Sequence, residues 1–311
     1  PKRTMPSKVT IIGCGAVGEA IANALVISDE ITDLVLSDVV KDKLRGMVLD
    51  FQHGQAFHAT RVVEAVDWAD TANSDVVIIT AGVRQREGES RRDLMGRNKS
   101  IMEHIVPPMA QHSPNAIVIV VANPCDFMTQ LVHKMSGFAE GRVFGSGTFL
   151  DSSRLRLELS KKIGVAPESI NAYVLGEHGD ASVVAVHTAT VGCTLLTELV
   201  SKEAISESHK AVIGAAGEVI KLRGYTATAI GMAVGKIVEA IVRDKLEIIP
   251  LSCPAKGRCG IEHDIYMSLP CIVDRNGVRP WHTVLPPEEC KHLQQTAAIM
   301  HEASKEVLGL E

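Results

Sequence analysis

The sequence lacks a long hydrophobic run, a cysteine framework and a surplus of one charge. Its longest apolar segments, such as 116–122, have the length of a buried strand and are too short to cross a bilayer. The 311 residues carry a formal charge of -5 with acids and bases interspersed, so no nucleic-acid surface is predicted. No Gly-x-Ser-x-Gly segment and no cluster of metal ligands occurs. We therefore expect no membrane, nucleic-acid or metal partner, and no α/β hydrolase.

The seven cysteines are scattered singly and form no Cys-x-x-Cys pair. Cys253 and Cys259 have no matched Cys or His partners, so reduced thiols in a reducing compartment are expected. The N-terminal segment has no hydrophobic targeting core, which makes the cytoplasm the default expectation. Because the chain begins with Pro1, a removed methionine or a cleaved transit peptide stays open.

The first half alternates short Val/Ile-rich runs with segments of helical periodicity, which predicts a parallel sheet covered on both faces. Strands are expected at 9–12, 34–36, 75–80 and 116–121, and helices at 17–26, 41–52 and 92–111. Right-handed crossovers then favour an α/β, doubly wound Rossmann fold. The length suits one large domain or two modest domains that share an interface, and 46% apolar residues are enough for a substantial buried core.

The second half has longer helical patterns and few strand-like segments. Helices are expected at 150–163, 202–221, 227–245 and 287–308, with a strand-like piece at 261–269. No linker, repeat or low-complexity segment separates the halves. We predict a Rossmann domain at 1–145 and a mixed α/β substrate domain at 146–311, with a site between them.

A glycine-rich segment follows the first expected strand and opens the first helix. Gly13 permits a tight turn, Gly15 lets the backbone approach a pyrophosphate, and Gly18 lets helix and strand pack closely. Asp38 lies twenty residues after Gly18, at the end of the second strand. A carboxylate there binds a ribose 2′-hydroxyl and repels a 2′-phosphate, which predicts NAD rather than NADP.

Two further segments carry acid–base chemistry. His178 lies between glycines in Gly-Glu-His-Gly-Asp after an apolar run, which suits a general acid or base. Other histidines, such as His104, His133 and His209, lie in helical patterns and are predicted on helix surfaces. Asp151 and Arg154 share one helix face, either as an ordinary ion pair or with separate roles. In the second case the carboxylate orients a histidine and the guanidinium binds a substrate carboxylate.

The polar segment 80–92 bridges a strand end to a helix and is rich in arginine. A solvated loop is one interpretation. Its place at the carboxyl end of a strand favours a ligand-binding loop that closes over the site.

Together these segments resemble the lactate/malate dehydrogenase family, and its L-lactate dehydrogenases in particular, over essentially the whole chain. The segments that carry the resemblance are GCGAVG, ITAGVRQREGESRRDL, VVANPCD, GSGTFLDSSRLR, GEHGD and EVIKLRGYTATAIG. The resemblance implies reversible hydride transfer between NADH and pyruvate. A non-catalytic NAD-binding protein is the remote alternative, disfavoured because His178, Asp151, Arg154 and Arg91 are all present.

The resemblance also implies a role for each matching residue. His178 is expected to donate and accept the proton, Asp151 to orient it, and Arg91 to polarise the carbonyl. The substrate is expected to meet Arg154, Asn123 and Thr226. The residues expected to bind the cofactor are Gly13, Gly15, Val17, Gly18, Asp38, Ala81, Gly82, Arg84, Asn98, Val121 and Asn123.

In this family the residue that matches Gln85 selects the substrate. Malate dehydrogenases have arginine there, so Gln85 favours pyruvate and lactate, because an amide leaves a second carboxylate unpaired. An inward turn of Arg86 would permit oxaloacetate, so a malate or a broader 2-hydroxy acid dehydrogenase stays as an alternative.

Regulation and assembly are also implied by the resemblance. Arg156 matches half of the basic pair that binds fructose 1,6-bisphosphate, but Asn171 replaces the histidine of that pair. We therefore expect weak activation or none. A homotetramer is the family expectation, and a dimer is the alternative, because the N-terminal extension is short.

Overall fold

The computed structural model describes residues 7–83 and 91–310, and of Arg91 it describes only the backbone. Within these ranges a large mixed sheet has nine strands in the order β14-β13-β12-β6-β5-β4-β1-β2-β3. The strands are β1 (Lys8–Ile12), β2 (Asp33–Ser37), β3 (Arg61–Glu64), β4 (Val76–Ile79), β5 (Ile117–Val120), β6 (Val143–Gly145), β12 (Glu247–Pro254), β13 (Tyr266–Asp274) and β14 (Gly277–Pro280). Strands β1 to β6 pair in parallel, and β12 to β14 continue the same sheet in antiparallel pairing.

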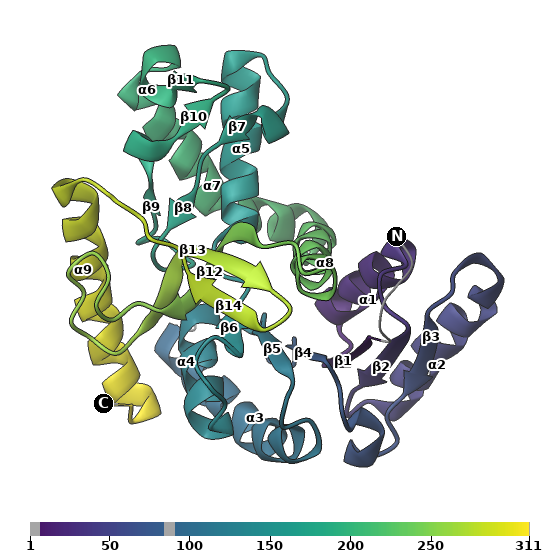
Figure 1. The fold of residues 1–311 in the computed structure, drawn as a ribbon. Helices are drawn as coiled ribbons and strands as arrows, with labels where there is room; N and C mark the ends of the chain where they lie inside the picture. The colour runs from purple at the N-terminus through teal and green to yellow at the C-terminus, as the bar shows by residue number, and fades with distance from the viewer. Residues whose placement is uncertain (1–6, 84–90, 311) are drawn as a thin grey trace.

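The larger helices lie against this sheet or in a lobe beside it (Figure 1). They are α1 (Ala16–Ser28), α2 (Lys41–His53), α3 (Arg91–His112), α4 (Cys125–Ser136), α5 (Phe149–Ile163), α7 (Lys202–Arg223), α8 (Thr228–Val242) and α9 (Pro287–Ala303). Figure 1 shows α5 and α7 in an upper lobe with the small strands, and α9 along one side of the molecule. That lobe contains β7 (Ile170–Asn171), β10 (Thr190–Val191), β11 (Thr194–Leu195) and the short helix α6 (Leu196–Leu199).

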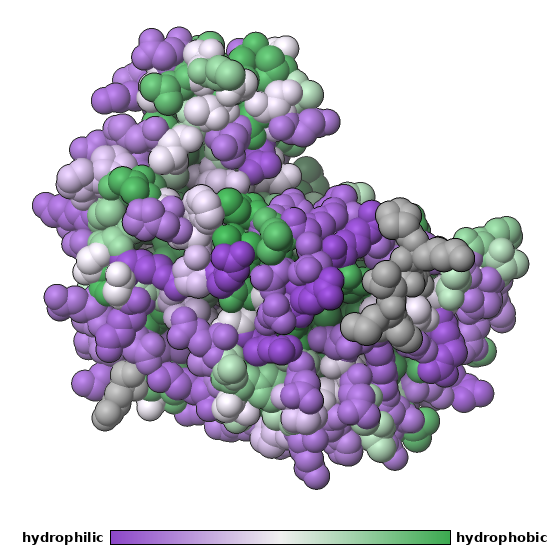
Figure 2. Space-filling view, in the orientation of Figure 1, coloured by the Kyte–Doolittle hydropathy of each residue, from purple (hydrophilic) through white to green (hydrophobic). Residues whose placement is uncertain are grey.

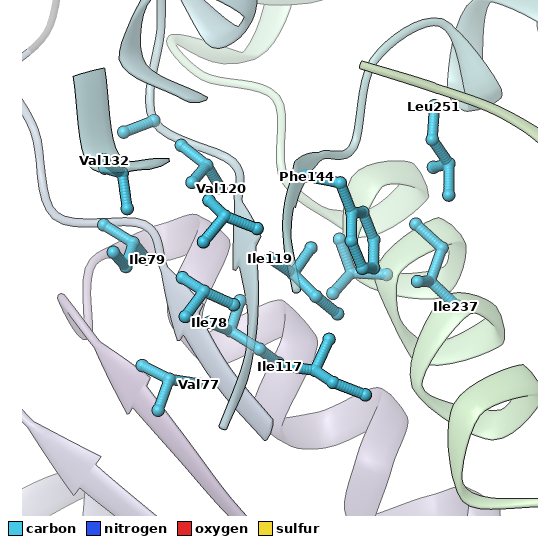
Figure 3. Packing of buried hydrophobic residues seen from close by; sticks show 14 of the residues in the cluster. Val77, Ile78, Ile79, Ile117, Ile119, Val120, Val132, Phe144, Ile237 and Leu251 are labelled. Atoms are coloured by element: carbon cyan, nitrogen blue, oxygen red, sulfur yellow. The ribbon is translucent and has the colours of Figure 1, made fainter. Parts of the chain in front are cut away.

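The core lies on both faces of the parallel strands, because β4 and β5 are buried along their whole length. In Figure 3, Phe144 of β6 lies beside Ile237 of α8 and Leu251 of β12. Val120 lies toward Val132 of α4, on the other face. This burial on two faces is why these strands have continuous apolar sequences instead of alternating ones.

Helix α8 joins the two halves of the chain by packing on α1 (Figure 1). A Cβ on Gly231 would lie 2.6 Å from the carbonyl oxygen of Ala20, so the helices approach too closely for a larger residue. Figure 2 shows hydrophilic residues over most of one face of the molecule, with smaller hydrophobic patches. In the described part of the chain, no helix is both long and apolar enough to cross a membrane.

The doubly wound α/β prediction is confirmed, and the structure corrects several details. Strands β3, β6 and β12 and helix α4 were not predicted from the sequence. The strand expected at 261–269 begins at Tyr266 and runs to Asp274. The closing helix ends at Ala303 and continues as a π-helical turn, Ser304–Leu308.

Candidate active site

The glycine-rich loop has the geometry of a phosphate site. A Cβ on Gly13, whose φ is +97°, would lie 2.4 Å from the backbone nitrogen of Ala81. A Cβ on Gly18 would lie 2.1 Å from the carbonyl oxygen of Gly13, whereas a Cβ on Gly15 would meet no atom of the described residues within 4 Å. Gly15 is also the N-cap of α1 and has no side-chain capping bond. The loop therefore offers open space and uncapped N–H groups to a phosphate, which fits a dinucleotide.

Asp38 lies beside this loop, half-buried at the end of β2. Its Oδ2 accepts a hydrogen bond from the backbone N–H of Cys14 at 2.6 Å, and its Oδ1 accepts one from Val40 at 2.9 Å. The predicted ribose-binding carboxylate is thus held against the glycine-rich loop, the position that the dinucleotide interpretation requires.

Asn98 of α3 connects the loops that follow β4 and β5. Its side chain is fully buried, with Oδ1 accepting from the backbone N–H of Val83 at 2.8 Å and Nδ2 donating to the Asn123 carbonyl at 2.5 Å. Gly82 packs against this amide, and the Asn123 side chain is exposed beyond it. Asn98 therefore fixes the backbone of the two loops on which Ala81, Gly82, Val121 and Asn123 were predicted.

The histidine predicted as the acid–base group is held by a nearly buried carboxylate. His178 Nδ1 lies 2.5 Å from Oδ2 of Asp151, while Oδ1 of Asp151 accepts from Arg154 Nη1 at 2.9 Å. Side-chain exposures are 11% for Asp151, 17% for Arg154 and 29% for His178. Asp151 thus pairs with Arg154 and also bonds the histidine, while binding of a substrate carboxylate by Arg154 stays a prediction.

This arrangement sets the protonation of the pair. Burial alone would lower the pKa of His178, but the charge and hydrogen bond of Asp151 raise it above its ordinary value. Burial raises the pKa of Asp151, and the charges of His178 and Arg154 outweigh that effect and lower it. Asp151 therefore favours the ionised form, and protonated His178 persists to higher pH than a free histidine.

A second carboxylate, which the sequence did not predict, bonds the backbone of the histidine. Asp126 lies in the first turn of α4, is 2% exposed, and its Oδ2 accepts the backbone N–H of His178 at 2.8 Å. Burial raises the pKa of this carboxyl to about 6. The available signal was its position in the segment VVANPCD, three residues after Asn123, at the end of a buried strand.

The remaining predicted residues are less fully placed. Thr226 is half-buried in the turn between α7 and α8. Arg91 begins α3, but its side chain lies outside the described residues, as do Arg84, Gln85 and Arg86 altogether. Among the described residues there is no group of three His, Cys, Asp or Glu side chains suited to a metal ion.

His209 corrects one sequence prediction, because it is not a free helix-surface residue. It is half-buried on α7, and its Nε2 lies 3.0 Å from Oγ of Ser182, just beyond the Gly-Glu-His-Gly-Asp segment. His104 is exposed as predicted, with its ring bonded to the carbonyl of Ser100 in its own helix. His133 is half-buried and bonds the carbonyl of Phe138.

The chain matches two family models over nearly its whole length. Residues 7–145 match the lactate/malate dehydrogenase NAD binding domain, and residues 148–310 match the lactate/malate dehydrogenase alpha/beta C-terminal domain. The L-lactate dehydrogenase A chain of Champsocephalus gunnari is 42% identical, covering 97% of this chain and 93% of its own. The L-lactate dehydrogenase B-B chain of Danio rerio is 41% identical, covering 98% and 94%.

A solved structure is similar as well. The lactate dehydrogenase from a Medee basin deep-sea metagenome library superposes with a TM-score of 0.93 at 33% identity, over 98% of this chain and 99% of that one. The dinucleotide geometry, the His178–Asp151–Arg154 arrangement and these matches agree, and the chain belongs to the lactate/malate dehydrogenase family.

Proposed function

We propose that this chain is an L-lactate dehydrogenase that interconverts pyruvate and L-lactate with NADH and NAD⁺. The observation that carries the proposal is the position of Asp151, which holds the acid–base histidine by one oxygen and a substrate-binding arginine by the other. The names of the two fish relatives support the choice of lactate.

The proposed mechanism begins with binding at the guanidinium of Arg154. Only one of its five N–H donors is used by Asp151 in the described contacts, so others can bind the substrate carboxylate. Asn123, Thr226 and Arg91 complete the substrate contacts, and Asn123 and Arg91 stabilise negative charge on the C2 oxygen. NAD, when bound, supplies or accepts the hydride at C2.

His178 moves the proton. In pyruvate reduction, protonated His178 donates from Nε2 to the C2 oxygen, and Asp151 stabilises the imidazolium before the transfer. In lactate oxidation, neutral His178 accepts the hydroxyl proton. Reduction is therefore favoured at pH values below the pKa of His178, and oxidation above it.

The proposed cofactor contacts follow the geometry of the first domain. The backbone at Gly13, Gly15, Val17 and Gly18 faces the pyrophosphate, and Asp38 binds the adenosine ribose and disfavours NADP. Ala81, Gly82, Arg84, Val121 and Asn123 contribute the remaining contacts. Asn98 contributes by holding the two loops that carry most of them.

Substrate choice rests on Gln85, whose amide offers no charge to a second carboxylate. Malate dehydrogenase activity is the second candidate, favoured only by the neighbouring Arg86. We further propose a division into 1–145 and 146–311, a homotetramer (a dimer is the alternative), a cytoplasmic location and weak or no activation by fructose 1,6-bisphosphate. For the last point, Arg156 donates to the Ala172 carbonyl at 3.2 Å and lies over the ring of Tyr173, while Asn171 is exposed.

One comparison of rates tests the proposal: NADH oxidation with pyruvate and with oxaloacetate, measured as kcat/KM on one preparation. A kcat/KM for pyruvate well above that for oxaloacetate supports lactate dehydrogenase activity. A higher value for oxaloacetate identifies a malate enzyme and assigns a basic side chain to the pocket. Turnover of neither substrate, with NADH still bound, supports a non-catalytic NAD-binding protein.

A further inference from the structure

The loop that carries His178 is the tip of a short hairpin. It connects β8 (Val174–Leu175) to β9 (Val183–Val184), with Leu175 opposite Val183. The position of the imidazole therefore depends on how the two ends of this tip are held.

The first end is held by the backbone. Gly176 exchanges two hydrogen bonds with Ser268 of β13, at 2.9 and 2.8 Å. This contact fixes the entry to the loop on the large sheet.

The second end is held by a side chain of α7. Ser182 is 6% exposed, and its Oγ lies 3.0 Å from Nε2 of His209. His209 follows Ser208, which is buried with Ile205 and Val212 against the core of the upper lobe. The exit of the loop is thus bonded to a helix that is itself fixed by packing.

The surroundings of His209 lower its pKa and so favour the neutral imidazole. Burial lowers its pKa and the nearby His292 of α9 lowers it further, while Asp151 of α5 opposes both. A neutral imidazole can either donate to or accept from the Ser182 hydroxyl. At neutral and alkaline pH, replacing His209 by an uncharged side chain therefore removes a hydrogen bond and no charge.

We propose that His209 is a positioning residue for the reaction. Through its hydrogen bond to Ser182 it fixes the end of the catalytic loop, so that His178 keeps its hydrogen bond to Asp151. This inference rests on the proposed function, because the loop has a catalytic role only if His178 transfers the proton.

Two variants at one site separate this role from simple packing. His209→Leu keeps most of the volume but has no polar atom, whereas His209→Gln can place an amide group near the position of Nε2. We expect His209→Leu to lower kcat for pyruvate reduction about fivefold to tenfold, the effect of one lost hydrogen bond, with the KM for NADH unchanged. His209→Gln is expected to stay within about twofold of the parent. His104→Leu, on the exposed face of α3, is the matched control and should not change kcat.

Ser182→Ala tests the partner and guards against a misfolded His209 variant. Its loss should equal that of His209→Leu, and the double variant should lose no more than either single one, because both remove the same bond. Equal losses in the Leu and Gln variants would overturn the proposal. So would a double-variant loss equal to the product of the two single losses.

A measurement that does not depend on turnover tests the positioning role of His209 independently of the proposed function. Diethyl pyrocarbonate modifies neutral imidazoles, and the rate of His178 modification against pH, followed by peptide mass, reports the pKa of that residue. If the loop loosens, the Asp151 hydrogen bond weakens and the pKa of His178 falls, so modification near neutral pH speeds up in His209→Leu and not in His209→Gln. Unchanged modification in both variants would refute the positioning role. An absence of pyruvate turnover in the parent would instead refute the proposed function.

Discussion

Replacing Asp151 by Asn is the most direct test of the acid–base pair. The substitution keeps the side-chain shape but removes the charge that Oδ2 places 2.5 Å from His178 Nδ1 and Oδ1 places 2.9 Å from Arg154. Removing one partner of a buried ion pair costs about 3–5 kcal/mol, or a factor of about 10² to 5 × 10³ in rate where the pair acts in the transition state. Because His178 is 29% exposed, we expect the lower end, a decrease of about 10² in kcat/KM for pyruvate.

The pH dependence of pyruvate reduction should also shift in a defined direction in Asp151→Asn. The pKa of His178 is raised by Asp151, so the protonated form persists to higher pH than in a free histidine. Reduction needs that form, and its rate falls as pH rises through the pKa. In Asp151→Asn the fall should therefore begin at lower pH.

The assay is kcat/KM for pyruvate from pH 5.5 to 9, with NADH binding followed by fluorescence as a check on folding. Glu158→Gln is the matched control, since Glu158 forms an i,i+3 pair with Lys161 on the same helix, at 2.6 Å but exposed to solvent. An exposed pair contributes little, so this variant should match the parent. A kcat/KM of Asp151→Asn within threefold of the parent, together with an unmoved pH limb, would refute this role of Asp151.

Three further substitutions extend the test. Gln85→Arg should shift preference toward oxaloacetate by supplying a partner for its second carboxylate, measured as the ratio of the two kcat/KM values; an unaltered ratio would remove Gln85 from substrate selection. His178→Asn should abolish most turnover while NADH binding, measured by fluorescence titration, stays nearly unchanged; lost NADH binding would mark His178 as structural. Asp126→Asn should move the pH limb of reduction to lower pH, because the charge of Asp126 also raises the pKa of His178. Asp126→Ala should lower the unfolding free energy by about 1–3 kcal/mol, because it leaves the backbone N–H of His178 unpaired. An unshifted pH limb and an unchanged urea midpoint would contradict these two expectations.

The sequence was sufficient for features that depend on local chemistry. Continuous Val/Ile runs predicted β1, β4 and β5, because strands covered on both faces need apolar side chains on both. The spacing of Gly13, Gly15 and Gly18 predicted a loop in which each glycine has a different steric reason to lack a side chain. In the structure, an added Cβ would clash at Gly13 and Gly18 and would enter open space at Gly15. Short elements such as β3 and β6 were missed, since three or four residues give too little periodicity.

Features that join distant segments could not be read from the sequence. Asp126, His178 and Asp151 come from three separate elements, and no spacing predicts that a buried carboxylate will accept the backbone N–H of a histidine 52 residues away. The same limit made His209 look like a helix-surface residue. Its polar contact is supplied by Ser182, which folding brings from another part of the chain.

By itself the sequence determined the doubly wound class, the dinucleotide loop and which residue types can carry the proton and bind a carboxylate. It did so because those properties follow from side-chain chemistry and from periodicity over a few residues. Only the tertiary structure decided that Asp151 contacts His178 and Arg154 at once, that Asn98 joins the loops after β4 and β5, and that the hairpin carrying His178 is bonded at both ends. These contacts depend on which surfaces the nine-stranded sheet and its helices bury against each other, and burial is a property of the whole fold.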